Sequence, residues 1–380
     1  MSSFRRKTPP PHTHGDGAAA SASSTVPLRG TKPFLNGQAL ISSGHAQLDA
    51  LLGGGLLLGT LALLETPPLA ASASSAALAA DVQRYFCAEG VAAAQRTVIV
   101  AQDAAGFAQY QLPLELSLAQ SQLRRAHAHA DTPADASLTI AWQYAKYIAS
   151  ADAAAQTQPQ TQRFCHSFDL ARPIHRELLA ANPPVLVDVL QLDATAREPQ
   201  SPRAVYEQLL SRIAAEVAAA AGRVVLRVSV QALGSPLVGA ADAAHMAALF
   251  AFVRQLRALA SGRPVVCVLS GALFAFPPEF AREVHHVCDY VVELKAFAGE
   301  QDLLPAELRA FHGLLDVRKL ARVHALACHA MDAAKVGLKR ERRKLKIEKF
   351  HLPPEGSRSS SSSTCGTGGT GSGGHDPLAF

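Results

Sequence analysis

The stretch TPPLAASASS, residues 66–75, follows an apolar run and stands where a phosphate-binding loop is expected. In such a loop, glycine N–H groups and a lysine hold the phosphates, and a Ser or Thr hydroxyl holds magnesium. This stretch has no glycine and no lysine, and its two prolines have no N–H to donate. Four hydroxyl side chains remain in a degenerate nucleotide loop, which predicts only weak anion contact: Thr66, Ser72, Ser74 and Ser75.

A second strand, RVVLRVSVQALGSPL, should carry the acid that supports magnesium, yet it has no Asp or Glu from Arg223 through Gly239. Because both halves of an ATP site are missing, we expect no catalytic residue and no ATP hydrolysis by this chain alone. Arg227, Ser229 and Gln231 alternate along the strand and therefore share one face. That face either lines the remnant of a nucleotide cleft or contacts a partner subunit.

The run KRERRKLKIEK, residues 339–349, holds seven Lys and Arg against two Glu, so its net charge equals the +5 of the whole chain. Clustered cations of this kind bind nucleic-acid phosphates in a salt-dependent way. Leu345 and Ile347 alternate with the charges, which predicts a strand; a solvated edge strand and a nuclear-localisation signal are the other interpretations. The candidate phosphate contacts are Lys339, Arg340, Arg342, Arg343, Lys344 and Lys346.

Composition narrows the class of protein. The 380 residues are 48% hydrophobic and 18% charged, which allows a sizeable core. The six cysteines stand singly, and the paired histidines lack neighbouring ligands, so we expect no metal site and a reducing compartment. The longest apolar run, residues 50–64, is too short to span a membrane. The N-terminus lacks a secretory core, although its Ser, Ala and Arg content leaves an organelle transit peptide open.

Short apolar runs alternate with longer helical patterns along the chain. This alternation predicts an α/β fold with a central, mainly parallel sheet that positions these residues. Segments 104–139 and 149–202 have weak periodicity and are expected to leave the sheet. We expect a disordered tail at 1–30, a folded domain at 31–355 and a disordered Ser/Gly-rich tail at 356–380. The predicted strands are 60–65, 97–101, 223–230, 264–269 and 290–294; the predicted helices are 76–89, 203–221 and 241–260, each followed by a glycine expected to end it.

Longer motifs carry a resemblance. SSGHAQLDALLGGGLLLGTLALLE (42–65) is similar to the opening of RecA-like and KaiC-like ATPase domains. Taken together and in order, the other motifs resemble the PAXNEB family of Elongator subunits: GTKPFLNGQALISSG (30–44), AEG (88–90), LTIAWQYAKY (138–147), RFCHSFDLARPI (163–174), RVSVQALGSPLVG (227–239), DYVVELKAF (289–297), FHGLLDVRKLARVHAL (311–326) and LKRERRKLKIEKFHLPPE (338–355).

The resemblance implies a RecA-like three-layer domain with a degenerate P-loop, and a non-catalytic, regulatory role in Elongator. It implies a hetero-hexameric ring with Elongator subunits five and six, two copies of each chain, that joins core subunits one to three. That ring is expected to bind tRNA and to support C5 modification of the wobble uridine, with the radical and acetyl-CoA chemistry in the third subunit. Any ATP would bind in the assembled ring and no cofactor in this chain alone; the location implied is cytoplasmic and also nuclear.

Two other classes of function remain open from the sequence. One is a RecA/KaiC-like ATPase or recombinase paralogue that binds ATP between neighbouring protomers and acts on DNA, with Arg227 or Arg318 as candidate arginines for a neighbour's site. The other is a scaffold with no nucleic-acid role.

Overall fold

The computed structural model describes residues 28–67, 72–118, 163–193, 201–306, 308–322 and 333–350. Residues 1–27 of the predicted N-terminal tail, all of the predicted C-terminal tail and the motif at 138–147 lie outside this description. The division into a domain at 31–355 with two disordered tails therefore stays a prediction.

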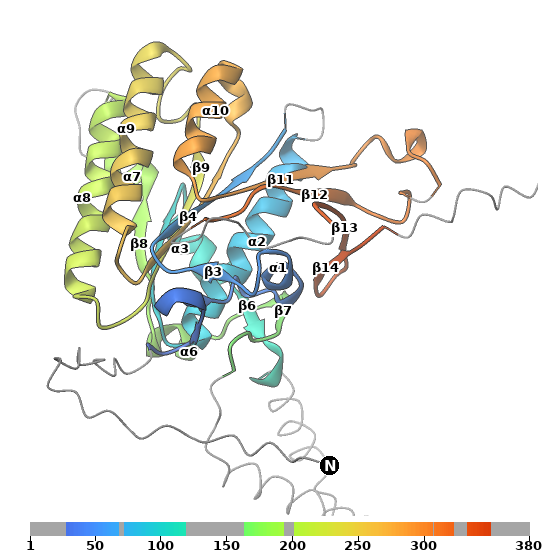
Figure 1. The fold of residues 1–380 in the computed structure, drawn as a ribbon, viewed down its shortest axis with the longest axis horizontal. Coiled ribbons are helices and arrows are strands. Elements are labelled where there is room, and N and C mark those ends of the chain that lie inside the picture. The colour runs from blue at the N-terminus through green and yellow to red at the C-terminus, as the bar shows by residue number, and fades with distance from the viewer. Residues whose placement is uncertain are drawn as a thin grey trace, which may run out of the picture.

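A nine-stranded sheet organises the fold, in the order β14-β13-β12-β11-β4-β10-β9-β5-β8 (Figure 1). The strands from β11 to β8 run parallel, whereas β12, β13 and β14 are added antiparallel beside β11. The expected α/β fold with a mainly parallel central sheet is confirmed. The strands are β4 Thr60–Glu65, β5 Arg96–Ala101, β8 Val185–Asp188, β9 Leu226–Leu233, β10 Val265–Gly271, β11 Tyr290–Ala296, β12 Gly313–Lys319, β13 Lys335–Arg340 and β14 Leu345–Glu348.

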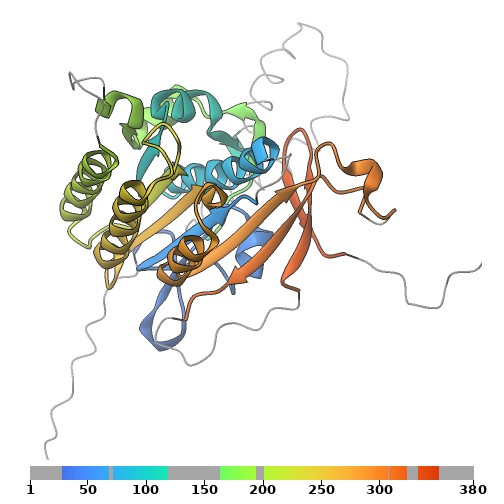
Figure 2. The ribbon, with the colours of Figure 1, turned by 90° about the horizontal axis from the view of Figure 1, so that it is seen from above.

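Helices cover both faces of this sheet and make a three-layer arrangement (Figure 2). Helix α2 (Ser72–Ala92) packs on one face, and α8 (Pro202–Ala220), α9 (Ala243–Ala260) and α10 (Pro278–Val287) pack on the other. Strand β4 shows why: Leu61 and Leu63 are buried in the core on the α8–α10 side, while Ala62 and Leu64 are buried on the α2 side. A strand with two buried faces needs apolar residues at successive positions, as Leu61–Leu64 provide.

The predicted helix ends hold for α8 and α9, but not for α2. We expect Gly90 to end this helix, and that prediction is wrong, because α2 continues through Gly90 to Ala92. The glycine serves close packing instead: a Cβ at this position would overlap the Thr97 hydroxyl and lie 2.8 Å from Cδ of Arg227. The absent side chain therefore lets the last turn of α2 approach β5 and β9.

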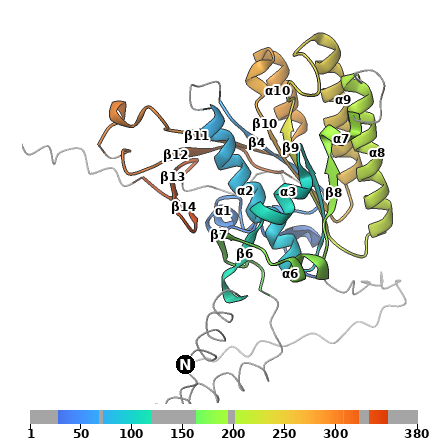
Figure 3. The ribbon, with the colours of Figure 1, turned by 180° about the vertical axis from the view of Figure 1, so that it is seen from behind.

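The weakly patterned segments give a mixed outcome. Strand β8, from within 149–202, joins the edge of the main sheet beside β5, so the prediction that this whole segment leaves the sheet is wrong. The described part of the first segment, residues 104–118, does leave it, as α3 (Ala104–Gly106), the π-helical turn η2 (Phe107–Gln111) and β6 (Pro113–Glu115). Strand β6 pairs with β7 (Phe168–Pro173) in a separate two-stranded sheet, seen from behind in Figure 3.

The remaining elements are short. A three-stranded antiparallel sheet precedes β4, and none of the described helices is long and apolar enough to cross a membrane. These elements are β1 (Thr31–Pro33), η1 (Leu35–Gly37), β2 (Ala39–Ile41), α1 (Ala46–Leu51), β3 (Leu56–Leu57), α6 (Arg176–Ala181), α7 (Val189–Asp193), η3 (Leu273–Ala275) and η4 (Gln301–Leu303).

Candidate functional site

The parallel strands β4, β5, β9 and β10 end at one edge of the sheet, beside the first turns of α2, and a cavity of about 380 Å³ opens there. Ligands of open α/β sheets bind at this carboxyl edge. This carboxyl-edge pocket is lined by Thr66, Ala76, Ala79, Ala80, Gln83, Gln102, Asp103, Phe107, Gln111, Gln231, Ala232, Ser270, Gly271 and Ala272.

One of the four predicted loop hydroxyls lines the carboxyl-edge pocket. Thr66 is buried, and its N–H donates to the Gly271 carbonyl at 3.3 Å. Ser75 lies outside the lining, where its hydroxyl accepts a hydrogen bond from the Ala296 N–H at 2.9 Å and so joins α2 to β11. Ser72 and Ser74 fall in the first turn of α2, and Ser74 is not among the residues that line the cavity.

The charge of the carboxyl-edge pocket does not suit a triphosphate. Its described lining contains no Lys or Arg, and its one ionisable side chain, Asp103, caps α3 by accepting from the Gly106 N–H at 2.7 Å. Gln231 adds a buried amide nitrogen with no hydrogen-bond partner among the described atoms, and Gln83 donates to the Val230 carbonyl at 3.0 Å. This arrangement can hold a neutral polar group, but no described cation there would neutralise phosphate charge.

Gln231 lines this pocket, as the cleft interpretation of the β9 face expects, but Arg227 lies at the opposite end of the strand. Arg227 is 1% exposed, so it neither lines the carboxyl-edge pocket nor faces a partner subunit, and it is not available to a neighbour's site. Its guanidinium donates to Gln95 Oε1 at 2.5 Å, to the Ser42 carbonyl at 2.8 Å and to the Phe86 carbonyl at 3.2 Å, and it stacks 4.8 Å from the Phe86 ring centroid. Arg227 is a structural residue of the core.

Two buried carboxylates accompany Arg227 and complete a buried polar network. Asp49 accepts from the Ser42 hydroxyl at 2.5 Å and from the Ser43 N–H at 2.7 Å, and burial raises the pKa of its carboxyl. Glu89, on α2, accepts from the His166 N–H at 2.9 Å and lies 2.8 Å from His166 Nδ1. The hydrogen bond to Glu89 raises the pKa of His166, although partial burial opposes this.

This buried polar network is what reasoning from the sequence missed. It joins four of the motifs that carried the family resemblance: SSG at 42–44, AEG at 88–90, the segment 163–174 and the segment 227–239. One of its contacts to the segment 163–174 joins His166 to Glu89 across 77 positions. The one available signal was the presence of isolated polar residues in otherwise apolar segments.

The predicted basic run forms the β13–β14 hairpin, whose turn lies at 341–344. Leu345 and Ile347 are buried as the alternation predicts. Three of the six candidate cations pair with nearby acids: Lys339 with Glu348 at 2.6 Å, Lys346 with Glu341, and Arg340 with Asp81 of α2 at 2.5 Å. Much of the positive charge of the run is therefore neutralised within the fold.

The hairpin turn presents the remaining three candidate cations. Arg342 and Lys344 are exposed, and neither forms an ion pair with another described residue. Arg343 is exposed too; its Nε lies 3.8 Å from Asp169, and its carbonyl accepts from the Leu170 N–H at 2.8 Å. Arg342, Arg343 and Lys344 are thus exposed at the turn, which contacts β7, and all six phosphate contacts stay a prediction.

Comparison with known proteins identifies the family. The family model for PAXNEB protein matches residues 24–380. The chain belongs to the PAXNEB family. The resemblance drawn from its motifs is therefore confirmed.

Relatives of this PAXNEB chain share one name. Elongator complex protein 4 of Dictyostelium discoideum is 27% identical over 86% of this chain and 77% of the relative. Elongator complex protein 4 of Homo sapiens is 26% identical over 96% of this chain and 88% of the relative, and that of Mus musculus is 28% identical over 93% and 85%. The similarity extends over most of both chains in each case.

Proposed function

We propose that this chain is a non-catalytic subunit of the Elongator complex. The observation that carries the proposal is family membership together with relatives named Elongator complex protein 4 that align with 86% and 96% of the chain. In this proposal the chain forms a hetero-hexameric RecA-like ring with Elongator subunits five and six and joins core subunits one to three. The ring binds tRNA and supports C5 modification of the wobble uridine, in the cytoplasm and also in the nucleus.

The RecA-like part of the proposal is supported by the three layers and by the carboxyl-edge pocket beside the start of α2. A degenerate P-loop fits this pocket, because its described lining offers no cation for a phosphate. A domain of this kind retains the surfaces by which such domains assemble side by side. Any ATP then belongs to the assembled ring, and this chain alone holds no cofactor and no metal.

Co-expression with Elongator subunits five and six tests the assembly. The expected result is a co-purified complex whose mass, measured by native mass spectrometry, corresponds to two copies of each chain. A monomer or a homo-oligomer that ignores both partners would refute the ring.

The hairpin turn carries the nucleic-acid part of the proposal. Reversing two unpaired cations, Arg342→Glu with Lys344→Glu, breaks no ion pair of the described fold and should weaken tRNA binding by the assembled ring. Because each lost phosphate contact lowers the slope of log K against log salt by about 1, the slope should fall by up to about 2. The matched control is Arg212→Glu with Arg223→Glu, two exposed cations on and just after α8 that form no ion pair with a described residue. Equal losses in both variants, or no loss in either, would contradict a hairpin contact.

The relatives give no support to an ATPase or recombinase acting on DNA. Isothermal titration calorimetry of the purified chain with ATP distinguishes the proposed Elongator subunit from such an ATPase. The proposal expects no saturation at micromolar ATP, because no described lysine or arginine lines the carboxyl-edge pocket. Micromolar affinity would refute the interpretation of residues 66–75 as a degenerate loop.

A further inference from the structure

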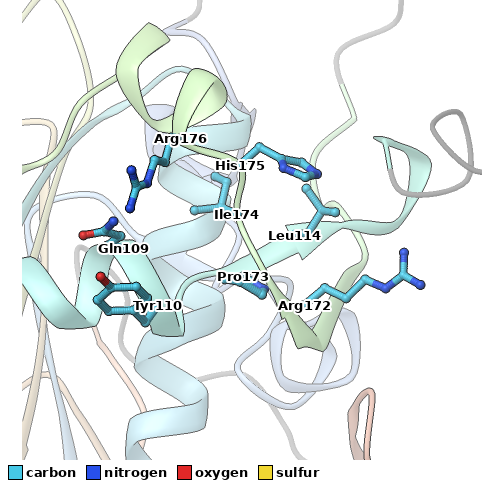
Figure 4. A pocket seen from close by; sticks show the side chains of 8 residues that line it. All are labelled: Gln109, Tyr110, Leu114, Arg172, Pro173, Ile174, His175 and Arg176. Atoms are coloured by element: carbon cyan, nitrogen blue, oxygen red, sulfur yellow. The ribbon is translucent and has the colours of Figure 1, made fainter.

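A second cavity, of about 410 Å³, lies beside the β6–β7 sheet and contains none of the residues predicted from the sequence (Figure 4). Its volume falls within the range of small-ligand sites. This hairpin-side pocket is lined by Gln109, Tyr110, Leu114, Arg172, Pro173, Ile174, His175 and Arg176.

The walls of the hairpin-side pocket are fixed by the core. The Ile174 N–H donates to the Leu112 carbonyl at 2.7 Å, which ties the end of β7 to the start of β6. Arg84 of α2 donates to the Gln111 carbonyl at 2.5 Å and to the Leu170 carbonyl at 3.0 Å. Both strands of the small sheet are thus held against α2, so the pocket is formed before any ligand arrives.

Tyr110 gives this pocket an unusual aromatic wall. Its side chain is 66% exposed, whereas Leu112 and Leu114 of the same segment are buried. Tyr110 belongs to the π-helical turn η2, a rare backbone form that occurs often at functional sites. An exposed ring beside the apolar side chains of Pro173 and Ile174 offers a stacking surface for a planar group.

Two arginines flank the apolar floor at different positions (Figure 4). The side chain of Arg176 lies on the side of Gln109 and Tyr110. With the Gln109 amide turned so that its oxygen faces the guanidinium, that oxygen accepts a hydrogen bond from Arg176 Nε at 3.0 Å. Arg172 extends from the other side of the floor. Neither arginine forms an ion pair with a carboxylate of the described residues, so both can receive anionic groups of a ligand.

Strand β7 connects the hairpin turn to the hairpin-side pocket. Leu170 of β7 donates its N–H to the Arg343 carbonyl at 2.8 Å, and Arg172 follows two residues later. Two residues of a strand span about 7 Å, so Arg172 lies between the turn and the end of β7, on the side of the pocket opposite to Tyr110 (Figure 4). The cations along this path are Arg342, Arg343, Lys344, Arg172 and Arg176.

We propose that the hairpin-side pocket binds an unpaired nucleotide of single-stranded RNA, with its base stacked on Tyr110 and the adjoining phosphates contacted by Arg172 and Arg176. The inference rests on the proposed tRNA binding and names a second contact site for it. Proteins bind single-stranded nucleic acids with exposed aromatic side chains beside cations, because every base can stack on a ring and every phosphodiester linkage carries a negative charge. An acidic peptide would use the arginines but gain nothing from an exposed tyrosine ring.

Fluorescence anisotropy with a labelled single-stranded RNA of twelve nucleotides, on the full chain in its assembled complex, tests the pocket. Tyr110→Ala should weaken binding roughly 5- to 150-fold, the equivalent of one lost base stack. Tyr110→Phe keeps the ring and should bind like the natural chain. Arg172→Glu with Arg176→Glu should weaken binding and lower its salt dependence.

Matched controls keep the result specific. Phe274, the control for Tyr110, is an exposed aromatic at the carboxyl edge of the sheet, and Phe274→Ala should leave RNA affinity within twofold. Equal losses of RNA affinity for Tyr110→Ala and Phe274→Ala would overturn the proposal. So would an acidic peptide of the same charge that competes as well as the RNA and whose affinity does not change in Tyr110→Ala. If the hairpin variant loses RNA and Tyr110→Ala does not, the pocket is wrong and tRNA binding stands. If the natural complex binds no RNA, both proposals fail.

Discussion

Replacing Arg227 by methionine tests the buried polar network most directly. The guanidinium is 1% exposed and donates to Gln95 Oε1 and to the carbonyls of Ser42 and Phe86. Methionine has a similar length and no donors, so the substitution removes the charge while it leaves little empty volume. The change in free energy of unfolding therefore reports on the polar contacts rather than on a cavity.

The magnitude follows from the groups that Arg227 leaves behind. Glu89 is 0% exposed and Asp49 is 5% exposed, and both lose the buried cation beside them. Arg227→Met also removes the donors to Gln95 Oε1 and to the Ser42 and Phe86 carbonyls. Each buried acceptor left without a partner costs about 1–3 kcal/mol, so the loss should reach at least about 3 kcal/mol. A typical domain has about 5–15 kcal/mol of stability in all, so Arg227→Met should bring the chain close to unfolding at 37 °C.

Urea unfolding at 25 °C, followed by circular dichroism, measures the effect. The control is Arg223→Met, an exposed arginine just before β9 that forms no ion pair with a described residue and should change stability by less than about 0.5 kcal/mol. Adding Glu89→Gln to Arg227→Met should cost less than the sum of the single changes, because Glu89 has then already lost its attraction to Arg227. A loss below about 1 kcal/mol for Arg227→Met would refute the reasoning, as would strict additivity.

Three further predictions concern the same core. The hydrogen bond to Glu89 raises the folded-state pKa of His166, so the stability from that bond is fully present below the unfolded pKa and is lost as pH rises through the folded pKa. His166→Gln should therefore remove this pH-dependent part of the stability. Stability curves of the natural chain and of the variant that stay parallel between pH 5 and 8 would contradict the prediction. Gly90→Ala should cost about 1–3 kcal/mol in urea unfolding, since its Cβ lies 2.8 Å from Cδ of Arg227, and a neutral result would show that α2 can shift. Tyr85→Phe leaves the buried Leu345 N–H without its acceptor and should cost about 1–3 kcal/mol, with faster hydrogen exchange in β14; unchanged exchange would rule out this role.

The fold followed closely from sequence periodicity, because the strands are buried on both faces. TLALLE predicted β4 with its bounds, and the Leu345 and Ile347 alternation predicted the inner face of β14. Local rules failed where tertiary packing decided the outcome. Gly90 has the usual type and place of a helix stop, yet close contact with β5 and β9 determines its role.

The candidate site was less accessible to sequence reasoning. The missing lysine and acid were visible directly, and the described lining of the carboxyl-edge pocket agrees with them in having no cation. The pairing of charges was not visible, because Arg340 meets Asp81 across 259 positions. Tyr110 and Arg172 lie 62 positions apart in the sequence, and only their placement around one cavity brings them together.

The link between β14 and the start of the chain affects how the protein is made. The Leu345 carbonyl lies 2.7 Å from His45 Nε2, and the Ile347 N–H donates to Gln47 Oε1 at 2.9 Å, each across 300 positions. At about 5–20 residues per second, a ribosome needs roughly 15–60 s to supply the second half of these contacts. During that interval the apolar side chains of Ile41 and Leu48 cannot complete their burial, so this part of the core closes only after β14 has been synthesised.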